Sequence, residues 1–109
     1  MKRTRAFSRT TEEVARLLGT RVRLGRTERR WSAQELADRI GVTRVTVNKI
    51  ERGDPTVGLG VAIEAAAMVG APLFTDDDAR LRLELSRDDD RLALLPRRVR
   101  KASTVDDDF

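Results

Sequence analysis

Residues 32–53 read SAQELADRIGVTRVTVNKIERG, and this stretch predicts two short helices joined by a tight turn. Ser32 is a favourable N-cap residue, and Glu35 three residues later completes a capping box. Trp31 and Leu36 flank the box at the positions of a hydrophobic staple. We therefore expect the first helix of the pair to begin directly after Ser32.

The turn and the second helix are marked in the same way. Gly41 suits the left-handed conformation in which the first helix must end, because a residue without a Cβ adopts it at little cost. Thr43 is the expected cap of the second helix, with Val42 and Val47 as its staple. Gly53 is expected to end that helix as Gly41 ends the first.

The apolar residues of both helices fall on one face. The expected inner face consists of Leu36, Ala37, Ile40, Val42, Val47 and Ile50. The outer face of the second helix consists of Arg44, Val45, Thr46, Asn48 and Lys49. A helix with such an outer face suits the major groove of DNA, so the pattern predicts a helix-turn-helix. The alternative is an ordinary helix pair whose outer face is polar because it meets water.

The outer residues divide by the chemistry of DNA. Arg44 and Lys49 are the expected base readers, and Val45 and Thr46 would supply short methyl and hydroxyl contacts. Phosphate contacts fix the register of a protein on the duplex without reading sequence. The side chains expected to make them are Ser32, Thr43 and Asn48.

Residues 18–73 resemble the lambda-repressor-like, Xre-type family of DNA-binding domains. The resemblance implies an all-α fold, a five-helix helix-turn-helix domain with a C-terminal extension here, that binds a palindromic operator in double-stranded DNA as a homodimer. The family usually has a phosphate-binding Gln directly after the opening Ser. This chain has Ala33 there and Gln34 next, and Gln34 joins the candidate DNA-binding set. The resemblance also implies that Arg26 pairs with Glu51 and is structural.

Charge is unevenly distributed along the 109 residues. Residues 1–52 hold 14 basic and 6 acidic residues, a net charge of +8, and residues 53–109 hold 8 and 12, a net charge of −4. The first half can therefore meet phosphate, whereas the second half repels it. A solvated charged surface is the alternative for the acidic half.

The composition argues against an enzyme. The chain has neither cysteine nor histidine, which excludes Cys-His and Ser-His nucleophile systems, disulfides and the usual zinc ligands. No Gly-rich phosphate loop follows a strand pattern, and we expect no cofactor. The basic start MKRTRAFSRT lacks the apolar stretch of a signal peptide, and no run is long enough to span a membrane. We expect a cytoplasmic, nucleoid-associated protein.

The domain expected to bind DNA covers residues 10–75, after a flexible basic arm at residues 1–9. Thr10 and Glu13 form a possible capping box for a helix that runs to about Arg29, and Gly19 and Gly25 predict a start or bend near Gly19. The expected inner residues of this helix are Val14, Leu17, Leu18 and Val22, with Trp31 packing in the core beyond its end. A further helix is expected from Leu59 to Val69, closed by Gly70 and Pro72, with Leu59, Ala62, Ile63, Ala66 and Val69 facing inward.

Residues 76–95 are the expected dimerisation or partner segment. Three aspartates, 76–78, favour a helix start there, and four leucines then recur near heptad spacing, namely Leu81, Leu85, Leu92 and Leu95. The run RLRLEL also alternates with period two, so residues 80–85 could form a strand; we favour the helix. The DDD clusters lack the spacing of a calcium loop, and we expect no metal site. Residues 96–109 have little to pack, and we expect a disordered tail.

A narrower resemblance extends to the C-terminus. The run IERGDPTVGLGVAIEAAAMVGAPLF, the segment LPRRVR and the closing VDDDF are similar to the HipB-type antitoxins that are encoded beside HipA-type kinase toxins. The resemblance implies a DNA-binding antitoxin that represses its own operon and neutralises a HipA-like kinase toxin. The alternatives are a stand-alone Xre-type transcriptional repressor and a protein-interaction adaptor without DNA affinity.

Overall fold

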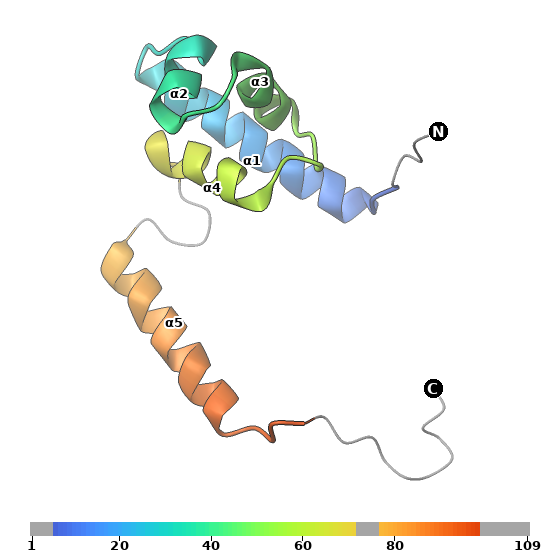
Figure 1. Cartoon of the computed structure of the whole chain (residues 1–109), viewed down its shortest axis with the longest axis vertical. Coiled ribbons are helices and arrows are strands. Elements are labelled where there is room, and N and C mark those ends of the chain that lie inside the picture. The colour runs from blue at the N-terminus through green and yellow to red at the C-terminus, as the bar shows by residue number, and fades with distance from the viewer. Residues whose placement is uncertain (1–5, 72–76, 99–109) are drawn as a thin grey trace. The chain divides into compact units, whose positions relative to one another are not determined.

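The computed structural model describes residues 6–71 and 77–98 and is all-α over that part of the chain, as the sequence predicts (Figure 1). It divides into two compact units, and the boundary lies between Asp76 and Asp77. The first unit holds four helices and the second holds one. The helices are α1 (Arg9–Glu28), α2 (Ala33–Ile40), α3 (Arg44–Arg52), α4 (Leu59–Met68) and α5 (Asp78–Ala93).

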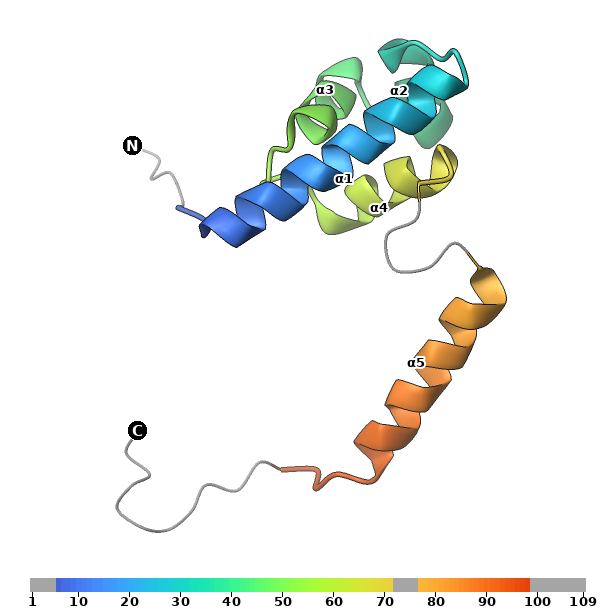
Figure 2. The same ribbon diagram turned by 180° about the vertical axis from the view of Figure 1, so that it is seen from behind.

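The core of the first unit lies where its four helices meet. The long helix α1 packs against α3 and α4, and α2 also packs against both of these (Figures 1 and 2). Its fully buried apolar residues are Val22, Leu36, Ala37, Val47, Ile50, Ala65, Ala66 and Val69. Four of the six residues expected on the inner face of the helix pair are among them, and the other two, Ile40 and Val42, pack against this cluster. The predicted inner face is confirmed.

Helix α1 begins earlier than the sequence pattern suggests. Ser8 is the N-cap, and its hydroxyl oxygen accepts a hydrogen bond from the backbone N–H of Thr11 at 3.1 Å. The predicted capping box of Thr10 and Glu13 is therefore wrong. Glu13 pairs instead with Arg9 one turn before it, at 3.4 Å. Arg9 is thus helical, although the sequence placed it in a basic arm whose first five residues lie outside the described part.

Helix α1 does not start near Gly19, because it is one helix from Arg9 to Glu28. Its two glycines serve close packing instead. A Cβ at Gly19 would lie 2.9 Å from the backbone oxygen of Glu51 in α3, and one at Gly25 would lie 2.7 Å from the backbone oxygen of Val69. The other chain segments approach α1 so closely that no larger residue fits.

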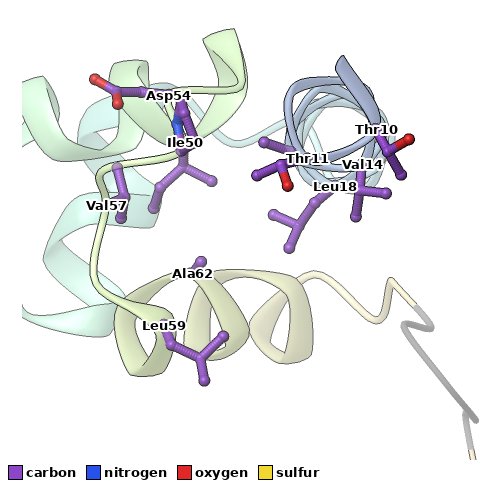
Figure 3. A pocket seen from close by; sticks show the side chains of 11 residues that line it. Thr10, Thr11, Val14, Leu18, Ile50, Asp54, Val57, Leu59 and Ala62 are labelled. Atoms are coloured by element: carbon purple, nitrogen blue, oxygen red, sulfur yellow. The ribbon is translucent and has the colours of Figure 1, made fainter. Parts of the chain in front are cut away.

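Several residues expected in the core are exposed. Val14 and Leu17 in α1 are 58% and 49% exposed, and Leu59 in α4 is 75% exposed. Val14 and Leu59 line an open apolar groove of about 430 Å³ between α1, the end of α3 and α4 (Figure 3). Ile63 in α4 is also exposed, whereas Ala65 is buried. Apolar residues occur on all sides of α4, so its sequence pattern does not select the buried face.

The segment that could have been helix or strand is helical, and it forms the start of α5. The side chain of Asp77 accepts a hydrogen bond from the backbone N–H of Ala79 at 2.9 Å and caps the helix. Arg80 and Glu84 form an ion pair one turn apart, at 3.5 Å, which only a helix permits. No residue of α5 is buried. The closing proline of the α4 prediction, Pro72, lies outside the described residues.

Candidate nucleic-acid interface

Helix α2 begins as the sequence predicts. The hydroxyl oxygen of Ser32 accepts from the backbone N–H of Glu35 at 3.0 Å, and the carboxylate of Glu35 accepts from the backbone N–H of Ser32 at 2.7 Å. Gly41 ends the helix with φ of +74°. The chain then returns through a hydrogen bond from the N–H of Val42 to the carbonyl of Ala37 at 3.0 Å. This turn fixes the angle at which α3 leaves α2.

Helix α3 is capped at both ends by the predicted residues. The hydroxyl oxygen of Thr43 accepts from the backbone N–H of Thr46 at 3.2 Å, and Gly53 closes the helix with φ of +81°. Val47 and Ile50 are fully buried on its inner side. The opposite side carries the exposed residues Arg44, Val45, Asn48 and Lys49. The structure thus turns four of the five predicted outer side chains of α3 towards solvent.

The fifth of them, Thr46, is half-buried. Its hydroxyl lies 3.2 Å from the hydroxyl of Thr43, so the two side chains form one pair at the start of α3. Thr46 can still contact a base edge through its methyl group and through the hydrogen-bonding capacity that the pair leaves over. Arg44 and Lys49 reach further and carry the positive charge of this face.

The caps of both helices are suited to phosphate. In Ser32 and Thr43 the hydroxyl oxygen accepts from the backbone. The O–H hydrogen of Ser32 can still be donated, and that of Thr43 can be donated when the Thr46 hydroxyl is the donor of their pair. Each side chain also stands at the positive end of a helix dipole, next to exposed backbone N–H groups. Gln34 is positioned differently, because its amide nitrogen donates to Asp38 at 2.9 Å. One of its two amide hydrogens is therefore engaged within α2.

The pair implied by the family resemblance is present and holds α3 in place. Arg26 in α1 donates two hydrogen bonds to the Glu51 carboxylate, at 2.6 and 2.9 Å, and a third to the carbonyl of Trp31 at 2.8 Å. The side chains of Arg26 and Glu51 are only 15% and 9% exposed. The hydrogen bond to Glu51 raises the pKa of Arg26. Arg26 is thus a structural residue that connects α1, the α1–α2 turn and α3.

Trp31 is half-buried rather than fully enclosed. It packs against the core cluster on one side. Two guanidinium groups cover its ring, that of Arg39 at 4.1 Å from the ring centroid and that of Arg29 at 5.8 Å. These contacts match cation–π geometry. Trp31 therefore occupies the predicted core position only in part, because arginine side chains cover its ring where the core does not.

Sequence reasoning missed the connection between α3 and α4. Thr56 and Gly58 line a hollow together with Thr46 and Lys49, two of the candidate DNA-binding residues. Asp54 organises this connection, because its carboxylate accepts from both the N–H and the hydroxyl of Thr56, at 2.8 and 2.6 Å. These hydrogen bonds, aided by the charges of Lys49 and Arg52, lower the pKa of Asp54. The run DPTVG signals a turn, but not that the turn lies beside α3.

Within the described part of the chain, no cluster of acidic side chains is arranged to hold a metal ion. Over the same residues, no helix combines the length and the apolar character needed to cross a membrane.

Comparison with known proteins agrees with this geometry. Residues 22–73 match the model of the helix-turn-helix family. The match covers the end of α1 from Val22 onward and all of α2, α3 and α4, which is the part of the chain that holds the candidate interface. Searches of curated proteins and of solved structures found no match to the chain.

Proposed function

We propose that the helix-turn-helix domain formed by residues 22–73 makes this chain a sequence-specific transcriptional repressor that binds a palindromic operator as a homodimer. The observation that carries the proposal is the two-sided character of α3. One side is anchored in the core by Val47 and Ile50, and the other presents Arg44, Asn48 and Lys49 to solvent. A helix held rigidly in this way can place long side chains against base edges in a major groove.

The division of roles follows from reach and charge. Arg44 and Lys49 are the proposed base readers, with Val45 and Thr46 as short contacts to neighbouring bases. Ser32, Thr43 and Asn48 are the proposed phosphate contacts. Gln34 is proposed as a phosphate contact through the amide hydrogen that Asp38 does not engage. The net charge of +8 over residues 1–52 supports this use of the first unit.

The base-reading role is tested by replacing Arg44 with alanine. We expect Arg44→Ala to weaken binding to the DNA upstream of the chain's own coding sequence by about 1–3 kcal/mol and to relax the preference at one base position. Arg87→Ala in α5 is the matched control, since it removes the same charge from an exposed side chain outside the domain. Equal affinities of the Arg44 variant and the original chain, measured by fluorescence anisotropy, would refute the assignment.

The finer proposal is that this repressor is a HipB-type antitoxin, which represses its own operon and neutralises a HipA-like kinase toxin. Support comes from the resemblance of residues 50–74, the segment LPRRVR and the closing VDDDF to such antitoxins. The second half of the chain, with a net charge of −4, is unsuited to DNA and is proposed to contact the partner. The competing proposal is a stand-alone repressor, which has no need for the acidic end.

Deletion of residues 105–109, which lie outside the described part, separates these proposals. For an antitoxin, we expect the shortened chain to bind its operator as before and to lose affinity for the kinase encoded beside it. Phe109 would bury an aromatic side chain in that complex, worth about 1.5–3 kcal/mol. Co-expression followed by co-purification measures the capture. If the neighbouring gene encodes no kinase, or the full chain does not capture it, the stand-alone repressor is favoured.

A further inference from the structure

Helix α5 carries an apolar seam that no described residue of the second unit, 77–98, covers. Leu81 and Leu85 are 43% and 57% exposed, and Leu92 and Leu95 are 66% and 60% exposed. Within α5, Leu81, Leu85, Asp88 and Leu92 follow the alternating spacing of four and three that places residues on one side of a helix as the a and d positions of a coiled coil. Leu95 continues this spacing just beyond the end of the helix. Asp78, the first residue of α5, continues the spacing at the other end, so the seam has three leucines and two aspartates within the helix.

Three side chains of α5, together with Leu95 just beyond its end, form a hollow of the kind that such a seam requires. Asp88, Arg91, Leu92 and Leu95 line one hollow on the surface of the second unit. Residues spaced in this way, at i, i+3, i+4 and i+7, are the four that receive a single knob from a facing helix in a coiled coil. The hollow has the position and the composition to accept one leucine side chain from another copy of α5.

The charges beside the seam select the direction of pairing. Arg82 and Asp89 flank the seam on one side, and Glu84 and Arg91 flank it on the other. If a second α5 runs antiparallel with its Leu81 opposite Leu92, each side of the seam lies next to the same side of the second copy. Arg82 then faces Asp89 of the second copy, and Glu84 faces its Arg91. All four flanking pairs of such a dimer are between opposite charges.

A parallel pairing in register would bring like charges together. It would place Glu84 opposite Asp89 of the second copy, twice in each dimer. It would also place the two Asp88 carboxylates opposite one another in the seam. In the antiparallel arrangement each Asp88 lies opposite a leucine, Leu85, and next to its own Arg91, with which it pairs at 4.0 Å.

We propose that two copies of the chain associate through antiparallel α5 helices, with Leu81 of each copy seated against Leu92 of the other. The proposed function requires a dimer, and this proposal specifies the contact that forms it. The biological role of the α5 pair therefore rests on the proposed function. Helix α5 has 16 residues, so the seam is about 24 Å long, and the pairing is weak by itself. Binding of both DNA-binding units to one operator would strengthen it by raising the effective concentration.

The test is a set of charge reversals in the full chain, with the dissociation constant of the dimer measured by sedimentation equilibrium. Asp89→Arg places two arginines opposite one another across the antiparallel pair, and we expect about tenfold weaker association. The double variant Arg82→Glu/Asp89→Arg restores the attraction and should return the constant to that of the original chain. Asp90→Arg is the matched control, since it makes the same change on the outer side of α5 and should have no effect.

Each other outcome overturns the proposal. Stronger association of Asp89→Arg would indicate parallel helices, because the new arginine would face Glu84. Equal association of all variants would place the dimer contact on another surface, and a chain that stays monomeric at every concentration has no such pair. Circular dichroism of each variant checks that the helices are retained.

Cross-linking provides an independent readout, because the chain has no cysteine of its own. When Leu81→Cys and Leu92→Cys chains are mixed and oxidised, we expect disulfides mainly between the two different variants. Disulfides mainly between identical variants, or none, contradict the antiparallel pair. A dimer that selects DNA through Arg44 but does not obey the charge rule overturns the α5 pair and leaves the proposed function standing. A dimer that obeys the charge rule but has no sequence preference on DNA supports the α5 pair and refutes the proposed function.

Discussion

At the residue scale, the pair of Arg26 and Glu51 has the largest consequence for the interface. It joins α1 to the end of α3, and its two side chains are almost completely buried. Removing one partner of such a pair leaves a charge without compensation in a poorly solvated place. The orientation of the proposed base readers therefore depends on a contact that itself touches no DNA.

We expect Glu51→Gln to lower the free energy of unfolding by about 3 kcal/mol, because Arg26 then keeps its charge without a counter-charge. Chemical denaturation monitored by circular dichroism measures this change. The control is Glu13→Gln, which breaks the exposed pair of Glu13 with Arg9 and should cost no more than about 0.5 kcal/mol. Equal effects of the two substitutions would mean that burial does not strengthen the Arg26 contact.

Asp54 provides a prediction about pH. Its pKa is lowered by the hydrogen bonds from Thr56, so its contribution to folding is complete above the ordinary pKa of an aspartate, about 3.9. The contribution is lost as the pH falls through the lower pKa of the folded state. We expect the amide resonance of Thr56 to titrate with a midpoint below about 3.9. In Asp54→Asn this titration should disappear, and a midpoint at or above the ordinary value would contradict the account.

At the scale of helices, local signals were sufficient for the helix-turn-helix but not for the surfaces around it. The capping box of Ser32 and the left-handed glycines are encoded by neighbouring residues, and they were predicted correctly. The exposure of Val14 and Leu59 depends on where α1 extends beyond its neighbours, which no local pattern contains. The sequence did not predict the left-handed conformation of Arg30 in the α1–α2 turn, with φ of +59°, because this conformation normally favours glycine.

The glycines of α1 and α4 give a matched prediction. Gly19→Ala should destabilise the fold by about 3 kcal/mol or more, because the new Cβ meets backbone atoms of α3 that cannot move independently. At Gly60 in α4 an added Cβ meets nothing within 4 Å, so Gly60→Ala should stabilise by about 0.5–1 kcal/mol. Thermal unfolding compares the two. A harmless Gly19→Ala would refute the close approach of α1 and α3.

At the scale of the whole molecule, the proposed division between DNA contacts and protein contacts follows the distribution of charge. The basic first half contains the helix-turn-helix, and the acidic second half contains the proposed dimer helix α5. The sequence predicted this division from charge alone. The proposed direction of helix pairing could be derived only once α5 was known to be helical and its seam could be assigned.

Salt dependence tests this division. A dimer that contacts about six to ten phosphates should lose roughly 10³- to 10⁵-fold in affinity between about 50 and 200 mM salt, because each contact releases counterions. Anisotropy titrations over that range measure the slope. A flat response would indicate that the basic half does not meet DNA. Deletion of residues 1–5 shows whether the basic start contributes to the slope.

The central claim is that α3 reads DNA within a symmetric dimer, and selection of binding sites from random duplex DNA tests it most directly. The account predicts enrichment of an inverted repeat whose half-sites are about 10 base pairs, or one helical turn, apart. It also predicts that Arg44→Ala loses the preference at one position in each half-site while the other positions remain. Absence of an enriched sequence, or an identical sequence selected by the Arg44 variant, would contradict the claim.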